Sequence, residues 1–429
     1  MIDFAAQISA TQAHPKTRSL IVATIIGNGL EWFDFTIYSF FAIIIAKLFF
    51  PTGDSLTSLL AAFATFAVGF FVRPIGGIII GAYADRVGRK AALSATILIM
   101  ATGTILIGLA PTYDSIGYWA PIIIIIARLL QGFSAGGEMG SATAFLTEHA
   151  PADKRGYYSA WIQSSIGVAI VLGTTAGTVL TTQLSEKDLY NWGWRLPFLF
   201  GAIIAPIGFY IRSQLSETLP LHDAQFKKEK SPFVDAIRNF PRETFISFLL
   251  VVLWTATSYV ILFYIPTYAV RALQLPPSVG FTAGIAGGLS IMLFTPIFGA
   301  ISDHYGRKPL LSLSSASIFI ASYPLFLYIN NNPDLRSLLI FEVLFGILIS
   351  AYTGPILAAF FEILPGRILS TGIAIAHNFA IMIFGGLAPM IVTWLIAKTM
   401  SNLAPAYYLM AAAAISFTAT LFYKKSAHI

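Results

Sequence analysis

Seven ionisable side chains lie inside long apolar stretches of this sequence, where a charge is costly. They are Glu31, Asp34, Arg73, Arg128, Glu138, Glu342 and His377. An ionised side chain in the interior of a lipid bilayer costs about 2.5–3.5 kcal/mol on insertion scales, so such residues are usually kept for a function. If the apolar stretches cross a membrane, these residues are the first candidates for carrying protons or binding a charged molecule.

Glu31 and Asp34 could carry protons. Because they are three residues apart, they share one face of a helix. A rise of about 1.5 Å per residue from a helix start near residue 20 places them about 16 and 21 Å deep, around the middle of a bilayer. Mutual repulsion and a low dielectric both favour the protonated form of at least one carboxyl group. The alternative is that one carboxylate only pairs with an arginine between helices.

Arg73 and Arg128 could bind an anion. Arginine keeps its charge in the membrane, and its planar guanidinium matches the geometry of a carboxylate. We predict a substrate contact for Arg73 and a role in binding or proton coupling for Arg128. In the alternative, both only neutralise the acidic residues Glu31, Asp34 and Glu138. Glu138 lies toward the end of its apolar stretch, where we expect a structural or coupling ion pair.

Polar and aromatic side chains in the second half of the sequence could complete a binding site. His377 titrates near neutral pH and, with Asn378, could bind substrate or relay protons, although a buried histidine more often only satisfies a hydrogen bond. Tyr259 and Tyr264 are predicted to line the site, with helix packing as the alternative. Glu342 lies early in its apolar stretch, so we expect it to face an outer vestibule or solvent.

The composition excludes ordinary soluble proteins. The chain has 429 residues, of which 56% are hydrophobic and 11% charged, against about 25% charged residues in a typical soluble domain. A mean hydropathy of +0.76 also excludes a disordered chain, which needs low hydrophobicity and high charge. Without cysteine there can be no disulfide and no thiol catalysis. The sequence therefore indicates a polytopic membrane protein.

Twelve apolar stretches are long enough to cross a bilayer as helices, which takes about 20 residues. They are residues 20–46, 57–82, 91–110, 119–147, 157–182, 194–212, 243–270, 279–300, 309–329, 337–362, 370–397 and 405–423. The stretches are apolar throughout, whereas the strands of a β-barrel alternate over about ten residues. We therefore predict an all-α membrane protein with twelve transmembrane helices.

The distribution of basic residues predicts the orientation in the membrane. With both termini inside, the inner segments contain 18 lysines and arginines and the outer loops contain 6, and cytoplasmic loops are enriched in these residues. The net charge of +6 thus follows membrane topology, and no nucleic-acid partner is expected. Residues 1–19 are polar and mixed, so we expect no cleavable signal peptide and a multi-pass protein of the inner (plasma) membrane.

The chain divides into two related halves. Residues 213–242 form the longest polar stretch, a predicted cytoplasmic linker that separates six helices in residues 1–212 from six in residues 243–429. Residues 81–90 follow the second predicted helix and residues 299–308 the eighth, and six of these ten positions are identical. Two parallel, pseudo-symmetric six-helix bundles around a central site are what a transporter with alternating access needs. A channel needs only a lined pore.

Charged residues in and near the two repeats could form latches between helices at the cytoplasmic surface. Asp85 is expected to cap a neighbouring helix N-terminus or to pair with Arg155. Arg86 and Arg89 are expected to reach Glu148. The corresponding residues of the second half are Asp303, Arg307, Glu362 and Arg367. Exposed pairs contribute only about 0–1 kcal/mol each, but they could bias a transporter toward an outward-open state of similar energy; otherwise these charges only set the topology.

The loop Gly-x-x-x-Asp-Arg-x-Gly-Arg-Lys at residues 81–90 resembles the signature of the major facilitator superfamily. Within it, the segments that resemble the metabolite–proton symporter family are residues 27–35, 73–77, 128–138, 266–268 and 384–389. The resemblance implies the major facilitator fold, a proton-coupled transporter and an association of Arg128 with proton transfer. Within that family, the chain resembles the branch of the citrate and tricarballylate symporters. The first motif also contains Asn28, a candidate substrate contact.

These observations predict a proton-coupled symporter that imports a small organic acid, citrate or a related di- or tricarboxylate, by alternating access. The alternative within the family is a zwitterion such as proline or betaine, whose cationic end could meet the tyrosines. A sugar-type facilitator would also carry the loop motifs. The sequence shows no metal-ligand cluster, nucleophile motif or nucleotide-binding loop, so we expect no enzyme, cofactor or metal. The expected partners are a carboxylate substrate, protons and the lipid bilayer, and we expect a monomer.

Overall fold

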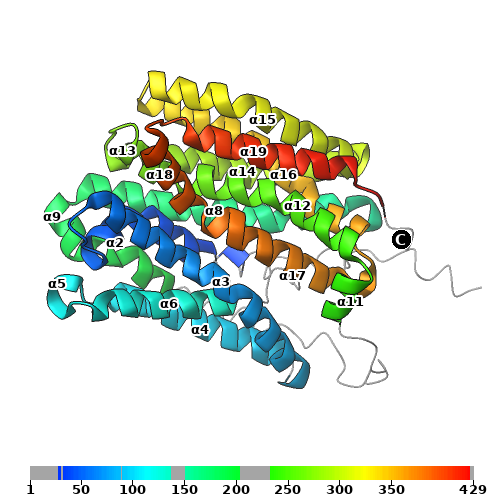
Figure 1. Ribbon diagram of the computed structural model, residues 1–429, viewed down its shortest axis with the longest axis horizontal. Coiled ribbons are helices and arrows are strands. Elements are labelled where there is room, and N and C mark those ends of the chain that lie inside the picture. Colours follow the sequence, from blue (N-terminus) through cyan, green and yellow to red (C-terminus); the bar gives the residue numbers. More distant parts are fainter. Residues whose placement is uncertain (1–27, 30–31, 88, 137–149, 203–231, 426–429) are drawn as a thin grey trace, which may run out of the picture.

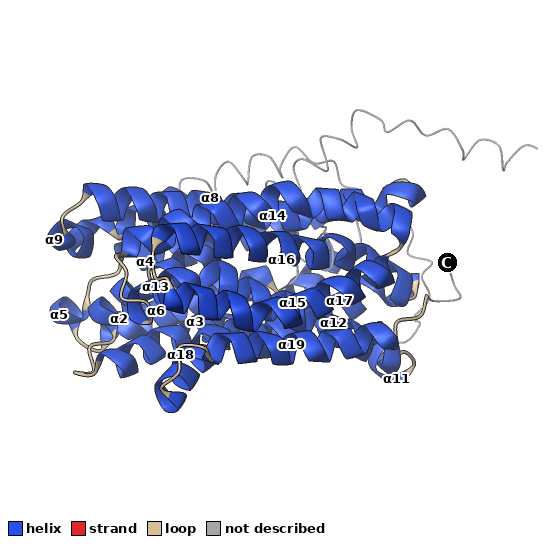
Figure 2. Cartoon of the chain, turned by 90° about the horizontal axis from the view of Figure 1, so that it is seen from above, coloured by secondary structure: helices blue, strands red, loops and turns tan. Residues whose placement is uncertain are grey.

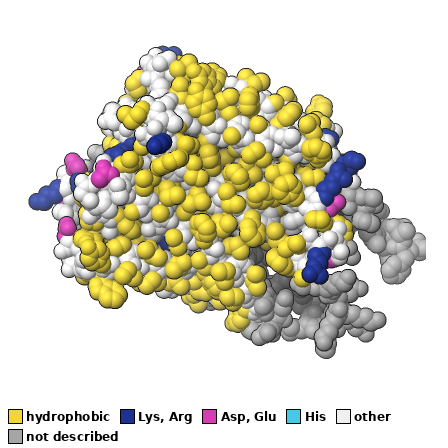
Figure 3. All heavy atoms as spheres, in the orientation of Figure 1, with side chains coloured by type: hydrophobic (Ala, Val, Ile, Leu, Met, Phe, Trp, Pro, Cys, Tyr) yellow, Lys and Arg dark blue, Asp and Glu magenta, His cyan; other side chains and the backbone are white. Residues whose placement is uncertain are grey.

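The computed structural model describes residues 28–29, 32–87, 89–136, 150–202 and 232–425. Long helices run roughly along one axis of the molecule, and no strand occurs in these ranges (Figures 1 and 2). Apolar side chains cover the middle of the face in Figure 3, and charged side chains gather toward its two ends. The end marked C in Figure 1 is here named the C-terminal end, and the end with α9 and α13 the opposite end.

The first half begins with a bent helix. Trp32–Phe40 and α2 (Ala42–Phe49) differ in direction by 66°. The long helices that follow are α3 (Ser55–Val87), α4 (Arg89–Leu109), α6 (Trp119–Ala135), α8 (Arg155–Gln183) and a helix over residues 195–202. The short segments are α5 (Tyr113–Ile116), η1 (Ala152–Lys154), α9 (Glu186–Asp188) and η2 (Leu189–Gly193).

The second half contains continuous and interrupted helices. The continuous ones are α14 (Pro277–Tyr305), α15 (Arg307–Asn331), α16 (Leu335–Ile363) and α19 (Ala404–Leu421). One interrupted span comprises α12 (Pro241–Thr257), η3 (Ser258–Phe263) and α13 (Ile265–Arg271), and the other α17 (Leu369–Ala380), η5 (Ile381–Gly386) and α18 (Ala388–Thr399). The short helices are α11 (Pro232–Arg238) and η4 (Gly366–Ile368).

Proline explains both interruptions. In each span a π-helical segment precedes a helix with proline in its first turn, Pro266 in α13 and Pro389 in α18. Proline has no N–H to donate and its ring clashes with the carbonyl group four residues earlier, so the winding changes before it. The π segments contact each other, because a Cβ on Gly385 of η5 would lie 2.9 Å from the ring of Tyr259 in η3.

The helices agree with the predicted spans. Each of the twelve predicted stretches contains helix within the described ranges. There, eight helices are long and apolar enough to cross a membrane, or up to nine if the bent pair is one span, and two shorter apolar helices are Ser94–Leu109 and Trp119–Ala135. The prediction of an all-α membrane protein is confirmed.

The two halves meet along α8 and α14, which pack antiparallel with glycines between them. A Cβ on Gly299 would lie 2.5 Å from the carbonyl oxygen of Gly156, near the C-terminal end. Farther along, a Cβ on Gly167 would lie 2.7 Å from the carbonyl oxygen of Gly288. Larger side chains would force the backbones apart. We call this interface the α8–α14 seam.

Candidate functional site

Asp34 of the first helix is buried and hydrogen-bonded to α4. Its Oδ2 accepts from the Thr104 hydroxyl at 2.8 Å, and Thr104 Oγ1 accepts from Nε2 of Gln131 at 3.0 Å. Oε1 of Gln131 accepts from Nη1 of Arg128 at 2.7 Å. Asp34 and Arg128 are therefore connected through two neutral side chains, one from α4 and one from α6. We call these four residues the relay.

The relay allows Asp34 to change its protonation with little rearrangement. Thr104 has one hydroxyl hydrogen, which can be donated to Asp34 or to the carbonyl group of Met100, 3.1 Å away. An ionised Asp34 accepts this hydrogen, whereas a protonated Asp34 can donate its own to Thr104. The amide of Gln131 connects the same hydroxyl to Arg128. This arrangement suits a carboxyl group that gains and loses a proton beside a fixed positive charge.

Aromatic rings surround both buried arginines. The guanidinium carbon of Arg73 lies 4.5 Å from the ring centre of Phe35 and 4.6 Å from that of Phe70. The guanidinium carbon of Arg128 lies 4.8 Å from Phe35 and 4.9 Å from Phe66. A desolvated cation over a ring face gains about 2 kcal/mol. The protein thus stabilises two positive charges around the shared ring of Phe35 in its interior.

The second half contributes His377 and Tyr259 to the same region. The ring of Tyr259 packs at 5.4 Å against Phe70, which also contacts Arg73. The ring of His377 lies 4.8 Å from that of Trp254, and His377 interacts electrostatically with Arg73. Neither ring nitrogen of His377 makes a hydrogen bond of standard distance and angle within the described part of the chain. The neighbouring Asn378 side chain also interacts with His377, and a role of His377 in binding stays a prediction.

Two predicted substrate contacts, Asn28 and Asn378, connect helices in this structure, and their role in binding stays a prediction. Nδ2 of Asn28 donates to the hydroxyl of Ser165 on α8 at 2.8 Å. Nδ2 of Asn378 donates to the carbonyl group of Gly136 at 3.1 Å, which connects α17 to the end of α6. Both side chains are buried, so their amide nitrogens contribute to helix packing in this conformation.

Tyr264 also lies apart from the arginines. Its hydroxyl accepts from Thr393 of α18 at 3.0 Å, and its ring packs against Phe63. Tyr259 is thus the predicted tyrosine that the fold brings to the arginines. Glu31 and Glu138 lie outside the described residues.

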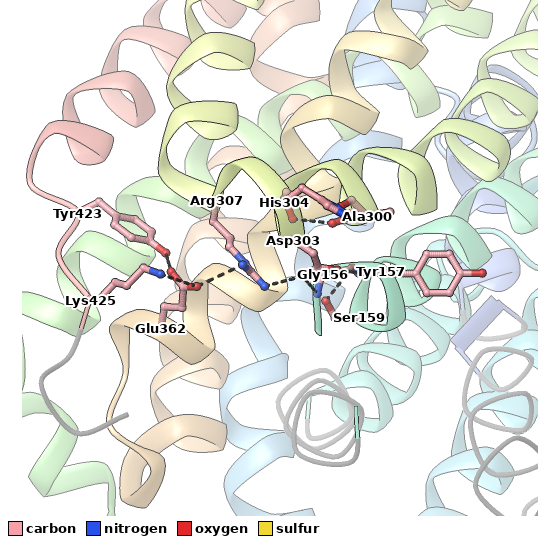
Figure 4. A network of polar contacts seen from close by, with 12 residues as sticks. Gly156, Tyr157, Ser159, Ala300, Asp303, His304, Arg307, Glu362, Tyr423 and Lys425 are labelled. Atoms are coloured by element: carbon pink, nitrogen blue, oxygen red, sulfur yellow. Dashed lines mark hydrogen bonds and ion pairs between the residues drawn. The ribbon is translucent and has the colours of Figure 1, made fainter. Parts of the chain in front are cut away.

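Figure 4 shows a polar network at the C-terminal end of the molecule. Oδ1 of Asp303 on α14 accepts from the backbone N–H of Gly156 at 2.8 Å, and Oδ2 accepts from that of Tyr157 at 2.9 Å. The carboxylate therefore caps α8, a helix of the other half. Nη2 of Arg307 donates to Asp303 at 2.5 Å, and its Nε lies 3.4 Å from Oε1 of Glu362.

The network joins three of the predicted latch residues, Asp303, Arg307 and Glu362, across the seam and along it. The guanidinium of Arg155, in contrast, lies over the ring of Phe361 at 4.1 Å. The other predicted latch residues have side chains outside the described part of the structure; they are Asp85, Arg86, Arg89, Glu148 and Arg367. Their role as a latch stays a prediction.

The structure corrects the expectation for Glu342. It was predicted to face a vestibule or solvent, but only 1% of it is exposed. The carboxyl group lies against Gly287 of α14, where an added Cβ would collide with it. The depth of a residue along a helix can be estimated from the sequence, but the face it presents to a neighbour cannot when the helix is apolar all round.

The relay residues Thr104 and Gln131 were missed because uncharged polar residues are common in membrane helices. Gln131 follows Arg128 by three residues, a spacing that places the two on one helix face. That spacing could have identified Gln131. Thr104 has no such signal, because it reaches Asp34 from another helix.

The fold and the buried charges define a polytopic membrane transporter. Residues 24–389 match the Major Facilitator Superfamily, so the chain belongs to that superfamily. The relatives that the chain matches are membrane transporters, and the chain is a transporter rather than an enzyme. The predicted fold and the resemblance to the metabolite–proton symporters with a citrate branch are confirmed.

Among individual proteins, the chain is similar to the citrate-proton symporter of Klebsiella pneumoniae, with 36% identity over 94% of this chain and 90% of that protein. It is similar to the proline/betaine transporter of Escherichia coli (strain K12), with 33% identity over 96% and 84%. The solved structure of the xylose transporter XylE from E. coli, in a partially occluded inward open conformation, gives a TM-score of 0.75 at 18% identity, covering 94% of this chain and 96% of that one. This likeness supports the fold alone.

Proposed function

We propose that this protein is a proton-coupled symporter that takes up a small organic acid, with citrate or a related di- or tricarboxylate as the first candidate. The observation that carries the proposal is the relay, in which a buried carboxyl group is connected to a buried arginine. The similarity to citrate-proton symporters at 36% identity supports it.

The relay gives a physical route for coupling. A proton on Asp34 removes a negative charge that otherwise competes with a substrate anion for Arg128. Conversely, an anion bound near Arg128 adds negative charge beside Asp34 and favours proton binding there. Each ligand therefore promotes the binding of the other, as linkage requires. Proton and anion would then cross the membrane together.

The residues around the arginines favour an anionic substrate. Arg73 and Arg128 supply two positive charges, and the relay contains one carboxyl group, Asp34. His377 adds two ring nitrogens from the other half. An anion between these groups would contact both halves, so its binding would favour closure of the bundles around it.

A zwitterion is the second candidate. The rings of Trp32 and Tyr259 lie 6.4 Å apart, and Phe263 is 6.1 Å from Trp32. Such a group of rings could accept a quaternary ammonium group while an arginine binds the carboxylate. The similarity to proline/betaine transporters supports this alternative.

We further propose that residues 1–212 and 243–429 are two bundles that move about the α8–α14 seam, joined by the linker 213–242. The distribution of basic residues supports a cytoplasmic location of both termini in a bacterial-type inner membrane. The C-terminal end of the molecule is then cytoplasmic, and Asp303 forms part of a cytoplasmic latch. Both helices of the α8–α14 seam come from one chain, in keeping with a monomer.

Uptake into proteoliposomes tests the proposal. Labelled citrate, α-ketoglutarate, proline and betaine are offered under an imposed pH gradient, acidic outside. We expect citrate or α-ketoglutarate to accumulate with acidification of the interior. Asp34→Asn should abolish this accumulation while exchange of substrate across the membrane remains. Asp54→Asn, a substitution of an exposed carboxylate before α3, is the matched control and should transport normally.

Three outcomes would contradict the proposal or part of it. Full proton-driven accumulation by Asp34→Asn would remove Asp34 from coupling. Accumulation of betaine or proline alone would favour the zwitterion. Uptake that never acidifies the interior would indicate a facilitator.

A further inference from the structure

A second buried carboxyl group lies outside the relay, on α16. Glu342 is 1% exposed, and neither carboxyl oxygen has a hydrogen-bond partner among the described residues. It is seven residues beyond the first residue of α16, so it lies about 11 Å along the helix from the opposite end of the molecule. A carboxyl group in this position has lost the hydration that water would provide.

Glycines make room for the Glu342 carboxyl group. It lies against Gly287 of α14, where a Cβ would collide with the carboxyl oxygen. One turn further along α16, a Cβ on Gly346 would lie 2.5 Å from Cβ of Ser290 on α14. The Ser290 hydroxyl donates to the carbonyl group of Ala286 at 2.8 Å and is therefore already used. The site is a close-fitting space in which the described residues offer no hydrogen-bond donor to stabilise a negative charge.

Within the described part of the chain, the helices packed against α16 offer no cation at this level. α14 has no charged or titratable residue between Pro277 and Ser302, and α8 has none between Ser159 and Gln183. Arg336 precedes Glu342 on α16 and is exposed at the surface. The other titratable or charged groups of α8, α12, η3, α14, α15, α16 and α17 are Arg155, Tyr157, Tyr158, Arg242, Glu243, Tyr259, Asp303, His304, Tyr305, Arg307, Lys308, Tyr323, Tyr328, Tyr352, Glu362 and His377.

An ionised carboxylate without partners in an apolar environment is far more costly than a neutral carboxylic acid. We propose that Glu342 is a second proton-binding site, occupied by a proton while the seam is closed at the opposite end. The adjacent residues Gly284 and Gly288 face α8, since added Cβ atoms there would lie 2.8 Å from Thr174 and 2.9 Å from Val171. Glu342 is thus separated from the seam by the width of one helix.

We expect α14 to loosen from α16 when it separates from α8, because Gly287 and Gly288 are neighbours on one helix turn. Water would then reach the Glu342 carboxyl group and allow it to release its proton. Protons would therefore favour closure of the seam at the opposite end, and alkaline pH would favour its opening. This inference does not depend on the substrate or on the role of Asp34.

Carbodiimide labelling tests the protonated carboxyl group directly in the wild-type protein. Dicyclohexylcarbodiimide reacts with buried protonated carboxyl groups, and peptide mapping of the full chain in lipid should locate the label on Glu342. Infrared spectra of the same protein should contain a protonated-carboxyl band that is lost in Glu342→Gln and retained in Asp34→Asn. Absence of the label from Glu342 together with an unchanged spectrum of Glu342→Gln would overturn the proposal.

Spin labels test the coupling to the seam. Cysteines at Thr182 and Gln274, both exposed at the opposite end, should report a longer distance at alkaline pH in otherwise wild-type protein. Glu342→Gln should lose this pH-dependent shift, and Asp114→Asn, which removes an exposed carboxylate of α5 at the same end, should keep it. If the shift survives in Glu342→Gln, the coupling to closure is wrong, whatever the transport assay shows for Asp34.

Discussion

Replacing Asp303 by asparagine should open the C-terminal end of the molecule. The Asp303 carboxylate accepts from the N–H groups of Gly156 and Tyr157 and from Arg307, and its side chain is only 2% exposed. Asparagine has a similar shape but a single acceptor oxygen. Its amide nitrogen would face a donor, and the attraction to Arg307 would be lost.

The distances allow an estimate of the cost. A hydrogen bond to a charged group contributes about 1.5–3 kcal/mol. Arg307 keeps Glu362 as a partner at 3.4 Å, so the substitution leaves no isolated cation. We therefore expect the closed arrangement to lose about 2–3 kcal/mol. Since about 1.4 kcal/mol is a tenfold change, its population should fall about 30- to 140-fold relative to the open one.

Distance measurements between spin labels can detect this shift. The chain has no cysteine, so cysteines introduced at Lys154 and Tyr305, exposed at the start of α8 and the end of α14, are labelled without background. We expect Asp303→Asn to lengthen the distance and to lower the rate of transport while binding is retained. The control is Asp334→Asn, in which the lost carboxylate caps its own helix at Ser337 and no other element.

An unchanged distance distribution with normal turnover in Asp303→Asn would refute this reasoning. The cap would then add stability to α8 without keeping the two halves together. A shift of the same size in Asp334→Asn would also refute it, since that carboxylate does not cross the seam.

Four smaller changes test other parts of the structure. Gln131→Leu should break the relay and lower pH-driven accumulation about tenfold in proteoliposomes, the effect of a loss of about 1.4 kcal/mol. Gly132→Ala should lower the thermal unfolding midpoint, because its Cβ would overlap a carbonyl group of α3 and overpacking costs about 1–3 kcal/mol. Gly366→Ala has open space around its Cβ and should be neutral. The backbone N–H of Ser337 donates to Asp334 and lowers the pKa of this carboxyl group. Asp334 should therefore stabilise the folded state above the ordinary aspartate pKa, and this stabilisation should be lost as the pH falls through the lowered pKa. Thermal unfolding at a series of pH values should show this loss in the wild-type protein and not in Asp334→Asn.

The spans could be predicted because a membrane requires each backbone polar group to be satisfied within its own helix. A run of about twenty apolar residues therefore predicts a helix that crosses the bilayer. The buried charges stand out for the same reason, since Arg73 and Arg128 are rare residue types in such stretches. Neither conclusion needs knowledge of which helices are neighbours.

The partners of those charges could not be predicted. Phe35, Phe66 and Phe70 are ordinary apolar residues in the sequence, and only the packing of the first helix on α3 and α6 turns them into rings around the arginines. The burial of Glu342 likewise depends on a glycine 55 positions earlier, Gly287. Such contacts follow from helix neighbours and rotations, which one sequence does not specify.

Two unlike carboxyl groups, those of Asp303 and Glu342, respond to the packing of α8 on α14. Asp303 stabilises the C-terminal end through bonds that an ionised carboxylate accepts, whereas Glu342 behind α14 is stable as a neutral acid. Glycines place the backbones of α8 and α14 close together at Gly156 and Gly299 and again at Gly167 and Gly288. Acid at the opposite end then favours closure there, and separation at the C-terminal end would require the Asp303 cap to break. A proton gradient directed this way would give the conformational cycle its direction.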